Sequence, residues 1–304
     1  MHDETPQEQT LQDQTFQAED IRNRLKDVGY LASADLGFSL SLMHRLNRPL
    51  LLEGEAGVGK TSLAKSLSKT YGSKLIRLQC HEGLNVNQSV YEWNYQRQLL
   101  SIKLLEGQPV SNIEDEIYSE KYLLERPLLE AIRQPESPIL LIDEIDRADD
   151  EFEAFLLEVL GEFQITIPEF GSIKAVSKPR VILTSNGTRE LSDALRRRCL
   201  YNYIDYPSLD EELHIIRLQL PTMDIDLASQ LVRFIKKLRS MQLRKVPGIA
   251  ETLDWAEALM CLNFRQLDQD LSSLQASLVC LLKHQEDRLD VDPITLKKLV
   301  SSAL

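Results

Sequence analysis

A glycine-rich segment near residue 54 constrains the fold more than any other feature of the chain. It fits the pattern GxxxxGK[ST] and lies between an apolar run and a stretch typical of a helix. Glycines let the backbone fold tightly so that successive N–H groups point inward, and a helix N-terminus adds partial positive charge there. The segment therefore predicts a phosphate-binding loop made of Gly54, Glu55, Ala56, Gly57, Val58, Gly59, Lys60, Thr61 and Ser62.

Two residues of this loop have specific expected roles with ATP. Lys60 is expected to contact the β- and γ-phosphates, and the Thr61 hydroxyl is expected to bind Mg²⁺. The alternative is a glycine-rich turn that matches the pattern by chance, which the flanking strand and helix patterns make less favoured.

A later apolar run ends abruptly in two carboxylates. Residues 139–142 are followed by Asp143 and Glu144. At the carboxyl end of a central strand, Asp143 can hold Mg²⁺ through its water shell, and Glu144 can orient and deprotonate an attacking water. The alternative is a buried strand that ends in a solvated acidic turn, which the upstream loop disfavours.

Polar and basic residues follow the next apolar run. Asn186 comes directly after residues 181–185, where it can position the water or touch the γ-phosphate, although an Asn after a strand is commonly a turn or cap. Arg196, Arg197 and Arg198 come at the end of a short helix expected over residues 191–195. An arginine inserted into a neighbour's site accelerates phosphoryl transfer by about 10³- to 10⁵-fold, so Arg198 or Arg197 is a candidate for that role; a solvated basic cluster is the alternative.

The pattern of apolar runs predicts the fold class. Five short runs alternate with amphipathic stretches, which predicts a mostly parallel five-stranded α/β sheet with helices on both faces. The expected strands lie at residues 49–53, 74–80, 138–143, 180–186 and 200–205.

Two further regions depart from this alternation. Residues 81–137 are too long for an ordinary connection and are expected to hold helices of their own, including one over 122–133 that is interrupted or begun at Pro127. After Pro207, helical spacing predicts an all-α domain with helices over 209–219, 252–262 and 268–283, and Pro293 opening a last one. The expected domains are therefore an α/β domain over 21–206 and a helical lid over 207–304.

Composition limits the remaining classes. The net charge is −12, and residues 1–20 carry six carboxylates without Lys or Arg, so they are expected to form a disordered acidic tail and leave only −6 elsewhere. No apolar run approaches the roughly 18 residues that cross a bilayer, and the acidic start is unlike a signal peptide, so a cytoplasmic protein without membrane insertion is expected. Four dispersed cysteines argue against a zinc site and favour a reducing compartment.

Taken together and in order, GEAGVGKT, ILLIDEID, VILTSN and ALRRRC resemble an AAA+ ATPase followed by a helical lid, over roughly residues 30–265. A hairpin-like stretch over 163–176 resembles the extra hairpin of the MoxR branch, and residues 91–99 resemble its CoxD-like subgroup. The resemblance implies Lys60 and Thr61 as Walker A, Asp143 and Glu144 as Walker B, and Asn186 as sensor 1. It also implies an arginine finger at Arg198 or Arg197.

The resemblance also implies partners, and the sequence departs from the family pattern at one position. It implies a self-assembled ring, usually a hexamer, and a chaperone-like remodeller that acts with a von Willebrand factor A domain protein. The implied client is a metalloenzyme resembling a molybdenum hydroxylase. The sensor 2 arginine typical of MoxR lids has no counterpart near residues 246–251, although Arg244 and Lys245 lie just upstream.

Two other functions stay open at this point. A nucleic-acid motor or loader would need a local basic patch, which the charge of −6 over residues 21–304 disfavours, so no nucleic-acid partner is expected. A non-catalytic regulatory binder would bind nucleotide without turnover, which Glu144 disfavours and the missing sensor 2 arginine favours.

Overall fold

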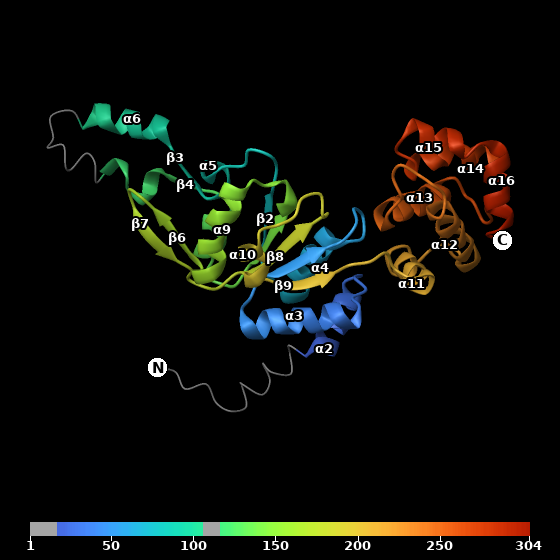
Figure 1. The fold of residues 1–304 in the computed structure, drawn as a ribbon, viewed down its shortest axis with the longest axis horizontal. Helices are drawn as coiled ribbons and strands as arrows, with labels where there is room; N and C mark the ends of the chain where they lie inside the picture. Colours follow the sequence, from blue (N-terminus) through green and yellow to red (C-terminus); the bar gives the residue numbers. More distant parts are fainter. Residues whose placement is uncertain (1–16, 106–115) are drawn as a thin grey trace. The chain divides into compact units, whose positions relative to one another are not determined.

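The computed structural model describes residues 17–105 and 116–304, which form two compact units (Figure 1). The N-terminal unit holds the described residues up to Val28 together with Ala32–Glu53 and Thr61–Tyr203. The C-terminal unit holds Ile204–Leu304 together with Gly29–Leu31 and Gly54–Lys60.

The predicted acidic tail lies mostly outside the described residues, but its end at residue 20 is corrected. Helix α2 (Ala18–Asp27) already begins at Ala18. Ile21 and Leu25, one turn apart, are fully buried, and the acidic residues Glu19 and Asp20 lie in the first turn, where the helix dipole favours negative charge. The acidic composition therefore continues into a packed helix.

The centre of the N-terminal unit is a parallel sheet of five strands, which confirms the predicted fold class. Its strand order is β2-β5-β8-β1-β9, and every neighbouring pair is parallel. The strands are β1 (Leu50–Glu53), β2 (Leu75–Gln79), β5 (Ile139–Asp143), β8 (Arg180–Ser185) and β9 (Leu200–Tyr203). Since β1 lies between β8 and β9, the chain reverses its direction of strand addition beside β1, and such switch points are where open α/β sheets bind ligands.

Both faces of this sheet are buried, as continuous apolar strands require. One face packs against α8 (Pro127–Arg133), α9 (Asp150–Glu162) and α10 (Asp193–Arg198) in a single apolar core. Helix α3 (Ala34–Leu46) runs along β1 and β9 (Figure 1). Helix α4 (Lys60–Tyr71) follows the glycine-rich loop and buries Leu63 and Leu67 completely.

The long insert between β2 and β5 contains a strand pair that the sequence did not reveal. Strands β3 (Tyr91–Trp93) and β4 (Leu123–Glu125) pair antiparallel, with α5 (Val86–Ser89), α6 (Tyr95–Leu104) and the short 3₁₀ turn Glu120–Tyr122 beside them in the chain. The helix expected over 122–133 therefore begins only at Pro127, because the residue before a proline disfavours helical geometry. A second antiparallel pair, β6 (Gln164–Ile167) with β7 (Gly171–Lys174), forms the hairpin expected before β8.

The C-terminal unit from Ile204 onward is helical in its described structure. Its core gathers around Trp255, which is fully buried, stacks near Phe234 with ring centroids 5.0 Å apart, and donates from Nε1 to Ser277. The helix expected over 268–283 ends at Ser277 and continues as the 3₁₀ turn Leu278–Cys280. The helices are α11 (Leu209–Gln219), α12 (Ile225–Arg239), α13 (Ile249–Cys261), α14 (Leu271–Ser277), α15 (Gln285–Asp290) and α16 (Pro293–Ser301).

Candidate active site

The carboxyl end of β5 carries a buried aspartate held from three sides. Asp143 is 3% exposed and accepts hydrogen bonds from the hydroxyls of Thr61 (3.1 Å to Oδ1) and Thr184 (2.5 Å to Oδ1). The guanidinium of Arg77 binds its Oδ2 at 2.5 and 3.1 Å. Because Arg77, Thr184 and Asp143 come from the adjacent strands β2, β8 and β5, the sheet itself fixes the direction of this carboxylate.

Glu144 follows in an unusual backbone conformation. Its φ of 55° and ψ of 49° lie in the left-handed region, and its N–H donates to the Thr184 hydroxyl over 2.9 Å. The turn directs the carboxylate out of the strand, where it is 31% exposed and receives Gln79 Nε2 at 3.0 Å and Arg147 Nε at 3.2 Å. A buried carboxylate and an accessible one thus stand side by side.

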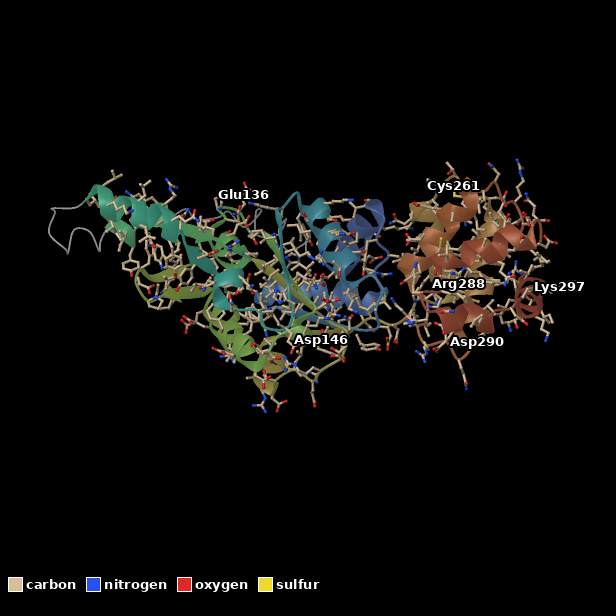
Figure 2. All side chains as sticks on the ribbon, turned by 90° about the horizontal axis from the view of Figure 1, so that it is seen from above. Glu136, Asp146, Cys261, Arg288, Asp290 and Lys297 are labelled. Carbon is tan, nitrogen blue, oxygen red and sulfur yellow. The ribbon has the colours of Figure 1, made fainter. Side chains whose placement is uncertain are left out.

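Asn186 directly follows the neighbouring strand β8 at the same edge. Its N–H donates to Oδ2 of Asp146 over 3.2 Å, and Asp146, which is labelled in Figure 2, follows Glu144 by two residues. Asp146 is 3% exposed and also receives the N–H and the hydroxyl of Thr188. The structure therefore brings Thr61, Asp143, Glu144 and Asn186, which lie far apart in the sequence, to one edge of the sheet.

The glycine-rich loop, in the C-terminal unit, has the strained geometry that its sequence predicts. Gly54, Gly57 and Gly59 have φ values of 158°, 82° and 99°, and a Cβ on Gly54 would lie 2.3 Å from the carbonyl oxygen of Ile204. The N–H groups of residues 55–59 are bonded to no backbone carbonyl of the described residues. A glycine-rich loop whose N–H groups are bonded to no backbone carbonyl of the described residues fits an anionic ligand.

The Lys60 side chain contacts carbonyl groups of its own loop. The Lys60 ammonium donates to the carbonyls of Gly54 (2.6 Å) and Glu55 (2.8 Å), and its side chain is nearly buried. The carbonyl of Gly57 accepts the N–H of Ile249, the first residue of α13, over 3.0 Å. Thr61, whose hydroxyl contacts Asp143, follows Lys60 directly in the chain.

Comparison with known proteins decides the family. Residues 49–199 match a family model described as AAA domain, dynein-related subfamily. An uncharacterized protein of Staphylococcus aureus strain bovine RF122 is 32% identical over 202 residues, which cover 64% of this chain and 70% of that protein. The chain belongs to the AAA+ family. An uncharacterized protein of S. aureus strain NCTC 8325 is 31% identical over the same shares of each chain, and one of Staphylococcus haemolyticus is 29% identical over 66% of this chain and 71% of its own.

The matched region of this AAA+ chain contains every residue proposed from the sequence for nucleotide chemistry. An AAA domain is a nucleotide-dependent ATPase domain, so binding of nucleotide follows from membership. The relatives' names describe no activity, and assignment to the MoxR branch stays a prediction.

The three arginines of the AAA+ domain do not share one environment. Arg196 is bound in its own chain, because its guanidinium donates to Glu53 Oε2 over 3.0 Å. Arg197 is 84% exposed and meets only Asp193 at 4.0 Å, and Arg198 is exposed with no ion pair to the described residues. The geometry thus leaves Arg197 and Arg198 as candidates for an intermolecular role and removes Arg196.

Arg197 and Arg198 lie at the amino edge of the sheet, since Leu200 opens β9 opposite Leu50. From that edge to Asp143 is roughly 13 Å along the strands and roughly 14 Å across them. These arginines therefore do not belong to the acidic cluster of their own chain.

The segment where a sensor 2 arginine was sought has a different local structure. Gly248 is the N-cap of α13, and a Cβ there would lie 2.8 Å from Cα of Gly57. Glu251 binds the N–H of Gly248 and lies 3.6 Å from the Lys245 ammonium, while Arg244 pairs with Glu286. Arg244 and Lys245 are thus both engaged within the C-terminal unit, and no sensor 2 residue is assigned.

Three residues of the site were not predicted from the sequence. Thr184 links Asp143 to the backbone of Glu144, and Arg77 and Gln79 each hold one of the two carboxylates from β2. In the sequence, Arg77 and Gln79 alternate with apolar residues of β2, so they share one face of this edge strand beside β5. This alternation indicates a shared face, and the contacts themselves depend on the strand order.

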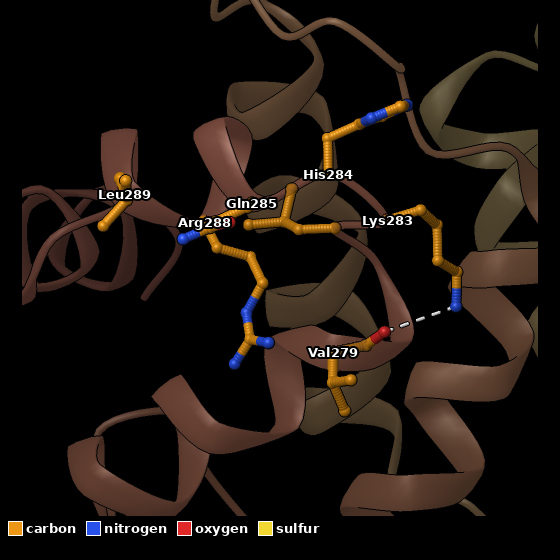
Figure 3. Close-up of a pocket in the computed structure, with 7 residues that line it drawn as sticks. Val279, Lys283, His284, Gln285, Arg288 and Leu289 are labelled. Carbon is orange, nitrogen blue, oxygen red and sulfur yellow. Dashed lines mark hydrogen bonds between the residues drawn. The ribbon is translucent and has the colours of Figure 1, made fainter.

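The remaining features do not indicate another nucleotide site. A pocket of about 790 Å³ beside α15 is lined by Lys283, His284 and Arg288 with apolar neighbours, far in sequence from the AAA motifs (Figure 3). Among the described residues, no three His, Cys, Asp or Glu side chains form a metal-binding group, and no helix has the length and apolar character that spanning a bilayer requires.

Proposed function

We propose that this AAA+ protein binds Mg²⁺–ATP and hydrolyses it within a self-assembled ring. The observation that carries the proposal is the pair of carboxylates at the end of β5. Asp143 is buried and fixed by Thr61, Thr184 and Arg77, whereas Glu144 is accessible in a left-handed turn. One carboxylate suited to a metal and one suited to a proton are what metal-assisted hydrolysis requires.

Thr61 and Asp143 fit a magnesium site. Their oxygens already contact each other at 3.1 Å, and Mg²⁺ commonly takes one or two protein oxygens, with phosphate oxygens and waters completing its shell. The absence of a larger acidic cluster in the described residues agrees with that preference. Bound Mg²⁺ would neutralise charge on the phosphate oxygens.

The other residues act on phosphate and water. The N–H groups of residues 55–59 and the Lys60 ammonium bind the phosphates, after Lys60 leaves the carbonyls of Gly54 and Glu55. Glu144 accepts the proton of the attacking water, and Asn186 orients that water or contacts the γ-phosphate. Either Arg197 or Arg198 of a neighbouring copy stabilises the charge that develops on the phosphate.

Replacement of the proposed base tests this function. Purified protein is expected to release phosphate from Mg²⁺–ATP, and Glu144→Gln is expected to bind ATP but to hydrolyse it about 10²- to 10⁴-fold more slowly. Glu151→Gln, an exposed change on α9, is the matched control and should keep the wild-type rate. Wild-type turnover by Glu144→Gln would reject Glu144 as the base, and absence of turnover by wild-type protein would favour a nucleotide-dependent binder.

We further propose a cellular role as a MoxR-type, chaperone-like remodeller of a metalloenzyme in the cytoplasm, in a hexamer and with a von Willebrand factor A domain partner. The antiparallel β6–β7 hairpin directly before β8 supports this proposal. The test uses Glu144→Gln as an ATP-locked trap in its native host. Enrichment of a von Willebrand factor A domain protein and a metalloenzyme with ATP, and not with ADP, is expected; recovery of neither contradicts this role and leaves the ATPase proposal intact.

A further inference from the structure

We propose that Asp146 is a positioning residue that sets the place of Asn186 in the site. The inference rests on the proposed hydrolysis, in which Asn186 acts on water or the γ-phosphate. Asp146 itself lies in the 3₁₀ turn Ile145–Arg147 after Glu144, and it acts on the neighbouring loop through hydrogen bonds.

One carboxylate oxygen holds the first residues of the loop after β8. Oδ2 of Asp146 accepts the N–H of Asn186 (3.2 Å), the N–H of Thr188 (3.0 Å) and the hydroxyl of Thr188 (2.6 Å). Between these residues Gly187 has a φ of 71°, which lets two N–H groups converge on a single acceptor. The direction in which the chain leaves β8, and with it the base of the Asn186 side chain, is therefore tied to the turn that carries Glu144.

The ordinary structural roles of an aspartate near a helix start do not account for Asp146. The N-cap of α9 is Asp149, whose side chain accepts the N–H of Phe152 over 2.8 Å. Asp146 also forms no ion pair with a described residue, although Arg147 and Arg189 are close in the fold. A buried carboxylate is costly unless it is hydrogen-bonded, and the three donors that contact Oδ2 of Asp146 come from Asn186 and Thr188.

The two carboxylate oxygens of Asp146 differ in their hydrogen bonding. Oδ1 is buried and has no hydrogen-bond partner among the described residues, and the side chain lines a pocket of about 440 Å³ with Arg189 and Asp149. Burial alone raises the pKa of Asp146, but the hydrogen bonds from Thr188 and Asn186 outweigh burial and lower it. Only one acceptor oxygen is used, so an asparagine can supply it with the amide nitrogen toward the pocket.

Substitution of Asp146 by alanine and by asparagine tests the proposal. Asp146→Ala is expected to lower kcat for ATP hydrolysis about 100-fold, because displacement of a positioned group by roughly 1 Å has such an effect. The KM for Mg²⁺–ATP should stay within about threefold, since the phosphate-binding loop is unchanged. Asp146→Asn should recover kcat to within about fivefold of wild type, because it retains the acceptor oxygen.

A second variant and a control keep the result interpretable if Asp146→Ala folds poorly. Thr188→Val removes one donor and keeps the backbone N–H, and an intermediate loss of about 3- to 10-fold in kcat is expected. Asp149→Ala removes the α9 N-cap, so it should lower the thermal midpoint and leave kcat unchanged.

The outcomes separate this inference from the proposed function. Wild-type protein without ATPase activity would reject the function, whereas active wild-type protein with unchanged kcat in Asp146→Ala and Thr188→Val would overturn the positioning role alone. Asp146→Asn as inactive as Asp146→Ala would also overturn it. A readout independent of turnover is the ratio of affinities for ATPγS and ADP, which Asp146→Ala should reduce about fivefold if Asn186 is displaced from the γ-phosphate.

Discussion

The two edges of the parallel sheet carry charge in opposite ways. At the carboxyl edge, Asp143 and Asp146 are buried, and each accepts several hydrogen bonds from residues of the same unit. At the amino edge, Arg197 and Arg198 are exposed, and together with Arg48 and Lys178 they line a pocket of about 720 Å³ in which Glu162 is the one acidic lining residue described.

The difference shows what each edge requires from outside the chain. The carboxylates are held in place before any ligand arrives, which removes the reorganisation that would slow the reaction. The arginines keep their charge available, and Arg48 fixes only the backbone beneath them, by donating to the carbonyls of Arg197, Arg198 and Cys199. The buried carboxylates are held by residues of their own unit, whereas Arg197 and Arg198 are exposed, and an anionic group of a second copy as their partner stays a prediction.

The largest expected effect comes from the amino edge. Replacing Arg197 and Arg198 together by alanine is expected to lower the ATPase rate about 10³-fold while ATP binding persists, because the charge that develops on phosphate loses its partner from the adjacent copy. Phosphate release and nucleotide binding are measured in parallel. Arg196→Gln, which removes the ion pair with Glu53 and the contact with the Tyr201 ring, is the matched control and should change the rate far less.

Mixing experiments sharpen this prediction. An inactive Arg197→Ala/Arg198→Ala protein mixed with inactive Glu144→Gln protein should regain part of the activity, because some sites then combine an intact Glu144 with arginines from the other copy. Absence of complementation in assembled mixtures would show that the two edges do not serve one site.

At the carboxyl edge, Thr184 is the non-acidic residue whose loss is expected to have the larger effect. Thr184→Val keeps the shape but leaves the N–H of Glu144 without its partner and removes one of the two hydroxyls that donate to Oδ1 of Asp143. A loss of about 1–3 kcal/mol in the free energy of unfolding is expected for unpaired buried polar groups, with roughly 30-fold lower turnover. Chemical denaturation and phosphate release measure the two effects, and Thr166→Val on the exposed hairpin is the control. Unchanged values for Thr184→Val would mean that the sheet alone orients the carboxylates.

A smaller effect is expected at Gln79. Its amide donates to Glu144 over 3.0 Å at an exposed position and accepts from Arg77, so Gln79→Ala removes these two contacts, leaves Arg147 beside Glu144, and creates no buried unpaired group. A change of about fivefold in turnover, without a change in stability, is expected. Steady-state kinetics and thermal unfolding provide the measurement, and a loss of stability would contradict this account of the contact.

The sequence predicted the motifs of the site but not the contacts between them. Lys60 was recognisable from the glycine-rich pattern GxxxxGK[ST], and Asp143 and Glu144 because they lie where an apolar run ends. Arg77 and Thr184 were not, because their contacts depend on the strand order β2-β5-β8, which periodicity does not contain. The difference in environment between Arg196 and Arg197 likewise depends on Glu53, which binds Arg196 and lies 143 positions before it in the chain.

The fold shows the same limit. The five core strands were predictable from their length and apolar character, whereas β3 and β4 are three residues each and lie too far apart in sequence to signal their pairing. The start of α2 was missed because acidic composition outweighed the spacing of Ile21 and Leu25 in the prediction.

The smallest expected effect concerns the reactivity of two cysteines, one beside each edge of the sheet. Their alkylation rates allow the two edges to be compared directly. Cys80 follows β2 near the carboxylates, and Cys199 follows Arg198. Burial first, and then the negative charges of Asp143, Asp146 and Glu144, together raise the pKa of Cys80 to about 12. Burial also raises the pKa of Cys199 to about 12, against the opposing effect of Arg48.

Since a raised pKa keeps a thiol protonated, alkylation of both cysteines by iodoacetamide should be slow at pH 8 and rise about tenfold per pH unit without a plateau below pH 11. Exposed Cys261 is the internal reference and should react first in peptide mass spectrometry. Substitution of Arg48 by glutamine should slow Cys199 further and leave Cys80 unchanged, because the cation acts only at the amino edge. A plateau near pH 9 for Cys80 would contradict the burial and negative charge assigned to the carboxyl edge.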